Sequence, residues 1–334
     1  MARTVKHFSL HRIAGMELRV VADVEAGVLP VIQVEEEVVR GYVQQGHWPH
    51  RWVTLFVLRD LQPLARQLRS RASLPPGGAA ALDHRPVVNV YDLADLASCH
   101  IFVNQQAMAR ESYWDDLQAM RGLLAHEHAH PLAENETSRA SRGLQIELLL
   151  DSQDKIRRLL TLLVDKLCLY APRELGANEV TIRSGFGEAL LYLDRYNMAN
   201  ASRGVAGRED LRRQLQQEVA QGSLTPAAAD LLLLIGDLRG YLDLALEVAP
   251  FYRTSRESDA QELEAVLQKA IFPHLEPQVA WAYAALREQY ITLRANLTLS
   301  EFQVWGDAVM GILAQALAEK GLALHYRWLV VGDK

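Results

Sequence analysis

The run His-Glu-His-Ala-His at positions 126–130 constrains this chain more than any other feature, because it contains the pattern H-E-x-x-H. On a helix, His126 and His130 lie one turn apart on the same face. Two imidazoles placed in this way can bind one zinc ion, and Glu127 beside the first can act on a metal-bound water. Pro131 disfavours α geometry at His130, so we expect the helix to end there.

The other positions of this helix favour a buried face beside the histidines. On a wheel of about 100° per residue, the adjacent apolar arc consists of Tyr113, Leu117, Met120 and Leu124. His128 points away from His126 and cannot bind the same ion, so we expect it to cap the helix or pack against a neighbour.

The first 140 residues alternate between strand and helix patterns. Alternating or β-branched residues predict strands at 16–23, 52–58, 86–91 and 100–104. Helical spacing predicts helices at 28–45 and 61–72, the second closed by Pro75 to Gly78. Together with the motif helix, these elements predict an α+β fold.

From Ser141 onward the chain is expected to be mainly helical. The stretches 144–169 and 172–196 have helical spacing, with a break expected at 185–187 in the second. Thr225 and Thr298 match helix N-caps, and Glu301 completes a capping box before the helix 302–318. Residues 322–331 alternate weakly and predict a final strand.

A catalytic zinc site takes three protein ligands and leaves one position open, so a third ligand must come from elsewhere. A third histidine six residues after His130 is excluded, because position 136 is Glu. Glu134 and Glu136 follow Pro131 too closely to fold back easily. Glu174 is the better candidate, with Glu179 as its rival.

His126-Glu127-x-x-His130 followed by Glu174-x-x-Ala177-Asn178 resembles the gluzincin metallopeptidases, in particular small intracellular members with the second signature E-x-x-A-[ND]. The resemblance implies that His126, His130 and Glu174 bind zinc and that Glu127 is the general base. It also implies that Asn178 orients a ligand histidine. Glu174 and Asn178 lie one turn apart on one helical face, which is compatible with these roles.

The resemblance covers about residues 50 to 200 and also implies a zincin-like small mixed sheet packed on the motif helix. The strand His100 to Asn104 is expected to be the edge that binds substrate backbone. Four residues are open candidates for the group that stabilises the oxyanion: Tyr192, His274, Tyr283 and Tyr290. Tyr192 can take part only if the chain bends at 185–187.

We therefore expect three parts in the chain. Residues 1–140 form an α+β subdomain with the edge strand and the motif helix. Residues 141–200 form a helical subdomain that supplies the third ligand, and residues 201–334 a helical region without an indicated role.

The net charge of −6 gives no electrostatic case for a nucleic-acid or membrane partner. Cys99 and Cys168 form no disulfide framework, and no secretory signal or stretch of 18 apolar residues occurs, so we expect a cytoplasmic protein. The sequence does not indicate the substrate or the oligomeric state.

The predicted function is zinc-dependent hydrolysis of a peptide or protein substrate, with Zn²⁺ as the cofactor. One alternative is a catalytically silent zincin scaffold whose helical half binds a partner. The other is a helical protein-binding module in which the H-E-x-x-H pattern is a coincidence.

Overall fold

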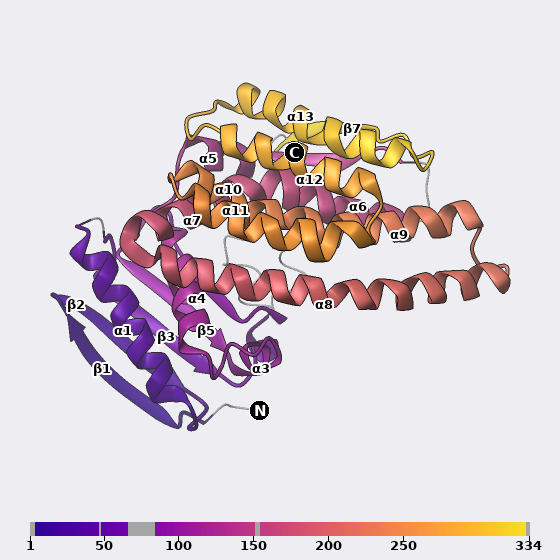
Figure 1. Ribbon diagram of the computed structural model, residues 1–334. Coiled ribbons are helices and arrows are strands. Elements are labelled where there is room, and N and C mark those ends of the chain that lie inside the picture. The colour runs from indigo at the N-terminus through magenta and orange to yellow at the C-terminus, as the bar shows by residue number, and fades with distance from the viewer. Residues whose placement is uncertain (1–3, 47, 66–83, 151–153, 332–334) are drawn as a thin grey trace. The chain divides into compact units, whose positions relative to one another are not determined.

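The computed structural model describes residues 4–46, 48–65, 84–150 and 154–331 (Figure 1). Contacts group the chain into two compact units. Unit 1 consists of Met1–Glu134 and Gly176–Leu193, and unit 2 of Asn135–Leu175 and Asp194–Lys334. The contacts therefore delineate two discontinuous units, whereas the sequence led us to expect three consecutive segments divided at 140 and 200.

Unit 1 contains a five-stranded mixed sheet with the strand order β1-β2-β3-β5-β4. The strands are β1 (His7–Ile13), β2 (Met16–Ala22), β3 (Trp52–Leu58), β4 (Val87–Tyr91) and β5 (Ser98–Asn104). The pairs β2–β3 and β3–β5 are parallel, and β1–β2 and β4–β5 are antiparallel. The small mixed sheet is thus confirmed, although β1 has no counterpart among the expected strands.

One face of this sheet forms the core of unit 1 beneath two helices. The register aligns Val20, Leu55 and Ile101 in one row on this face, and all three are fully buried. The covering helices are α1 (Val28–Gln44), which lies across the sheet in Figure 1, and α4 (Leu117–Ala129). Between β5 and α4 lies the short helix α3 (Gln105–Arg110).

The expectation that His100–Asn104 forms the sheet edge is wrong. These residues belong to β5, which lies between β3 and β4, so that β4 is the last strand of the sheet among the described residues. The reason is that β4 and β5 pair as antiparallel neighbours, Asn89 opposite Ile101, while β5 also pairs with β3. Most of the helix expected at 61–72 and the breaker at 75–78 lie outside the described residues, which contain a 3₁₀ turn at Gln62–Leu64.

Unit 2 is mainly helical, with one two-stranded sheet. Its elements are α5 (Glu136–Arg142), β6 (Leu144–Leu148), α6 (Asp154–Val164), α9 (Pro226–Tyr241), α10 (Ala245–Arg253), α11 (Glu257–Val266), α12 (Pro277–Thr292), α13 (Leu299–Ala318) and β7 (Tyr326–Val330). The expected caps at Thr225 and Thr298 are both present, and Glu301 completes the capping box.

The helix expected from Leu144 begins later than predicted, because residues 144–148 form β6. This strand pairs with β7, the strand expected near the C-terminus, and Leu144 lies opposite Val330. Its burial alternates, with Leu144, Ile146 and Leu148 buried. Leu144, Ile146 and Leu148 alternate as in a strand, whereas Ile146, Leu149 and Leu150 have helical spacing. The local pattern is therefore ambiguous, and pairing with the distant β7 decides for the strand.

A nearly continuous helical path runs from α6 to residue 220. It passes through a wider π-helical segment (Asp165–Tyr170), α7 (Ala171–Thr181), a second such segment (Ile182–Phe186) and α8 (Gly187–Ala220). Gly185 has φ 87°, which breaks the helix where the glycine pair predicts a break.

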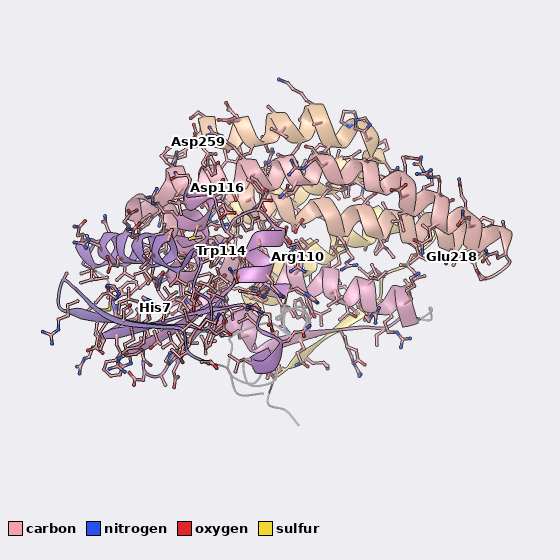
Figure 2. All side chains as sticks on the ribbon, turned by 90° about the horizontal axis from the view of Figure 1, so that it is seen from below. His7, Arg110, Trp114, Asp116, Glu218 and Asp259 are labelled. Atoms are coloured by element: carbon pink, nitrogen blue, oxygen red, sulfur yellow. The ribbon has the colours of Figure 1, made fainter. Side chains whose placement is uncertain are left out.

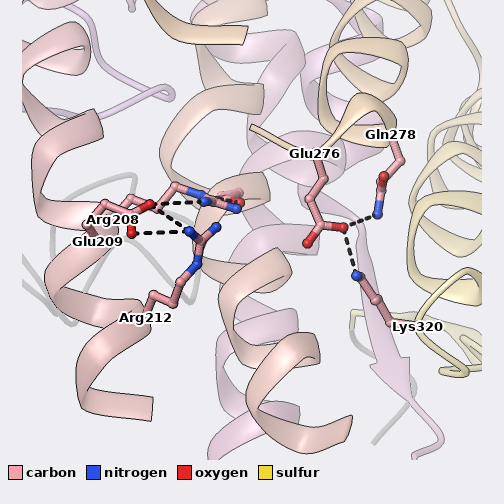
Figure 3. A network of polar contacts seen from close by, with 7 residues as sticks. Arg208, Glu209, Arg212, Glu276, Gln278 and Lys320 are labelled. Atoms are coloured by element: carbon pink, nitrogen blue, oxygen red, sulfur yellow. Dashed lines mark hydrogen bonds and ion pairs between the residues drawn. The ribbon is translucent and has the colours of Figure 1, made fainter. Parts of the chain in front are cut away.

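Polar contacts join helices of unit 2 (Figure 3). The Nε of Arg208 on α8 donates to both oxygens of Asp237 on α9, at 2.8 and 2.9 Å. In the same view, Glu276 at the start of α12 accepts from Lys320 at 2.8 Å and from Gln278 at 2.7 Å. Within the described residues, no helix combines the length and apolar character needed to cross a membrane.

Candidate metal centre

The motif helix α4 begins at a well-formed cap. The carboxylate of Asp116, labelled in Figure 2, accepts hydrogen bonds from the amides of Gln118 (3.1 Å) and Ala119 (3.0 Å). The helix ends at Ala129, as expected from Pro131. His130 nevertheless keeps helical angles (φ −52°, ψ −52°), so the expectation of non-helical geometry at this residue is wrong.

Three contacts fix α4 within unit 1. The hydroxyl of Tyr42 on α1 donates to the Ala125 carbonyl at 2.8 Å, and burial raises the pKa of this tyrosine. His128 Nε2 donates to Glu35 at 2.8 Å, and both side chains are fully buried. The absence of a side chain at Gly122 allows close approach of α8, since a Cβ there would lie 2.5 Å from the Ala189 carbonyl oxygen.

His126 and His130 project from the last turn of α4 toward each other. Their ring centroids lie 4.7 Å apart and the rings meet edge to face. The Nδ1 of His126 donates to Oδ1 of Asn178 on α7 at 2.6 Å, which leaves Nε2 as the coordinating atom. The Glu127 carboxylate, 11% exposed, has an oxygen 4.0 Å from His130 Nε2.

Helix α7 also brings Glu174 to this group. Glu174 lies one turn before Asn178 on the same helix, so α7 presents both residues on one face. The possible ligand atoms of His126, His130 and Glu174 all lie within 4.8 Å of one another. Among the described residues, these three side chains form the one cluster of histidine, cysteine or acidic residues that is close enough to share a metal ion.

The donor set and its spacing fit zinc. Two histidines and one glutamate leave one coordination position open for water or substrate. Tetrahedral ligand atoms about 2.1 Å from zinc lie roughly 3.4 Å from each other. The possible ligand atoms, all within 4.8 Å of one another, are close enough to be compatible with one shared ion.

Two other predicted site residues, Glu179 and Tyr192, do not belong to this group. Glu179 forms an ion pair with Arg183 one turn further along the chain, at 3.4 Å, and is not part of the group. Tyr192 donates to Asp116 at the opposite end of α4, about 15 Å along the helix from His126. The break at Gly185 thus does not bring Tyr192 to the histidines.

The remaining oxyanion candidates belong to unit 2. Tyr290 is buried and donates to the Leu167 carbonyl at 2.8 Å, and Tyr283 is buried against Phe272. His274 lies in a short 3₁₀ turn and is exposed. None of these contacts links a candidate to the His126 group.

Sequence reasoning missed Asn89 on β4, whose side chain contacts the motif helix. Its Nδ2 donates to the Glu127 carbonyl at 2.6 Å, and its Oδ1 accepts from the Cys99 thiol at 3.1 Å. The available signal was an asparagine inside the apolar run Val-Val-Asn-Val-Tyr, where β propensity disfavours it. A polar residue in such a strand needs a buried partner.

Comparisons of the chain with protein-family models, with curated proteins and with solved structures give no significant match.

Proposed function

We propose that this chain is a zinc-dependent metallopeptidase of the gluzincin type. The observation that carries the proposal is the approach of Glu174 to His126 and His130. The hydrogen bond from His126 to Asn178 adds support, because ligand histidines usually donate their second ring N–H to an oxygen. Two signatures far apart in the sequence thus meet in one group with a catalytic donor set.

The roles of the side chains follow from their positions. When bound, zinc lowers the pKa of water and polarises a carbonyl group. The Glu127 carboxylate takes a proton from the attacking water and then delivers it to the nitrogen of the leaving amine. Asn178 holds the His126 ring by its Nδ1–H, which fixes the tautomer that presents Nε2.

The strand that ends the sheet supplies a site for an extended substrate. Among the described strands β4 lies at the sheet edge, and its Asn89 donates to the backbone carbonyl of Glu127. A peptide that pairs with β4 runs beside the motif helix, and its backbone is held by main-chain hydrogen bonds. This assigns to β4 the role that the family resemblance gave to residues 100–104.

The zinc content of the purified wild-type protein and of two variants tests the site. Wild-type protein should carry about one zinc per chain by elemental mass spectrometry, and Glu174→Ala should lose most of it. Glu179→Ala is the matched control, because Glu179 lies on the same helix and pairs with Arg183. Zinc-free wild-type protein, even after incubation with zinc, would contradict the proposal.

Glu127→Gln tests the catalytic step separately. This change keeps the size of the side chain but removes the carboxylate base, so zinc should stay bound while peptide hydrolysis falls by at least about 100-fold. Hydrolysis should be followed with a mixture of peptides of different sequence, because the proposal does not specify a cleavage sequence. A Glu127→Gln protein that cleaves as fast as wild type would remove Glu127 from the mechanism. Zinc without hydrolysis in wild type would favour the binding scaffold.

A further inference from the structure

The carbonyl group of Glu127 lacks its normal helical partner. In an α-helix this oxygen accepts from the amide four residues later, which here is Pro131 and has no N–H. The His130 amide donates to it instead, but at 3.4 Å this hydrogen bond is long. A carbonyl oxygen has two lone pairs, so this oxygen can accept a second, shorter hydrogen bond from a donor outside the helix.

Asn89 supplies this donor from the neighbouring strand. Its Nδ2 lies 2.6 Å from the Glu127 oxygen, and the asparagine is only 4% exposed. On the sheet, Asn89 lies opposite the fully buried Ile101, in the row that faces the helices. The bond thus joins the last turn of α4 to the edge strand within the core of unit 1.

Cys99 determines which way the Asn89 amide faces. The thiol lies 3.1 Å from Oδ1 of Asn89. Burial raises the pKa of Cys99 well above its usual value, so the group remains a thiol and acts as a donor. The amide oxygen must therefore face Cys99, and the NH₂ group must face the Glu127 carbonyl.

We propose that Asn89 is a positioning residue of the metal centre. By holding the Glu127 carbonyl, it fixes the turn that carries His126, Glu127 and His130 and keeps that turn in register with β4. The inference rests on the proposed function in one respect, namely that the centre binds zinc. The placement of the histidines by Asn89 requires neither bound zinc nor peptide hydrolysis.

Asn89→Asp tests this role with little change in size. The donor NH₂ becomes a carboxylate oxygen facing a carbonyl oxygen, so the turn should move. We expect zinc affinity, measured by competition with a chromogenic chelator, to fall about tenfold or more. The imidazole ¹⁵N signals of His126 and His130 in metal-free protein should shift as well.

Asn104→Asp is the matched control. Asn104 is also a buried asparagine of this sheet, 1% exposed, but its Oδ1 caps α3 by accepting from Ala107 at 3.2 Å. Aspartate performs the same capping. This variant should keep the wild-type zinc affinity and imidazole signals.

Cys99→Ala provides a second test if Asn89→Asp does not fold. It removes the donor that orients the amide but leaves Asn89 in place, so both readouts should change in the same direction and to a smaller extent. A folded Asn89→Asp protein with wild-type zinc affinity and imidazole signals would overturn the inference and leave the proposed function intact. If wild type binds no zinc but the imidazole signals still shift in Asn89→Asp alone, the proposed function fails and the positioning role stands.

Discussion

His50 is a buried histidine of unit 1 that makes the stability of the fold depend on pH. It is 4% exposed, its Nδ1 donates to the Leu96 carbonyl at 2.5 Å, and its ring packs edge-on against Trp48. Burial lowers its pKa to about 4. Between pH 6.5 and pH 4 the unfolded chain therefore takes up a proton that the folded chain does not.

The stabilisation from neutral His50 is present above pH 6.5 and is lost as the pH falls toward 4. The shift corresponds to about 3 kcal/mol. In urea unfolding between pH 7 and pH 4, His50→Gln should therefore lose less stability than wild type. His274→Gln, a change at an exposed histidine, should follow the wild-type curve. Parallel curves for wild type and His50→Gln would show that His50 is not a neutral buried group.

Single residues also show how far the candidate site could be predicted. His126, Glu127 and His130 follow from local spacing alone, because four residues make one helical turn. Glu174 and Asn178 follow from a second local pattern, and the structure brings both to the histidines. Asn89 could not be assigned in this way, because no local pattern tells which strand faces the carbonyl that Pro131 leaves open.

At the scale of elements, the crossing of α4 and α8 depends on one glycine. A Cβ at Gly122 would lie 2.5 Å from the Ala189 carbonyl oxygen, and backbone cannot move aside as a side chain can. Gly122→Ala should therefore lower the free energy of unfolding by about 1–3 kcal/mol, although alanine favours helix.

Gly207→Ala is the control for helix propensity. Gly207 also lies inside a helix, α8, but a Cβ at this position would meet no atom within 4 Å beyond its own stretch of helix. This variant should therefore gain up to about 1 kcal/mol. Urea unfolding measures both values. A stability gain for both variants would mean that the helices do not cross as closely as the structure describes.

Elements with local signals were predicted well, and pairing between distant segments was not. The helix α13 and its capping box follow from residues 298–318 alone. In contrast, β6 became a strand because β7, about 180 residues later, pairs with it. The order of β4 and β5 likewise depends on which neighbour each strand meets. Hydrophobic patterns specify a face but not a partner.

At the scale of the whole molecule, zinc should stabilise the fold. The three proposed ligands come from the C-terminal end of α4 and from α7, so an unfolded chain does not hold them together. Free zinc at 100 times its dissociation constant should then add about 2.7 kcal/mol to the free energy of unfolding. Urea unfolding with zinc and with a chelator measures this difference.

Two variants separate this effect from zinc binding elsewhere on the chain. His126→Ala should remove the zinc-dependent stabilisation, because one ligand is lost and Asn178 loses its imidazole donor. Glu127→Gln should keep it, because Glu127 takes part in proton transfer and not in binding. If zinc stabilises His126→Ala as strongly as wild type, then the metal binds the folded chain at a place other than the last turn of α4. In that case the stabilisation no longer supports a catalytic role for this turn.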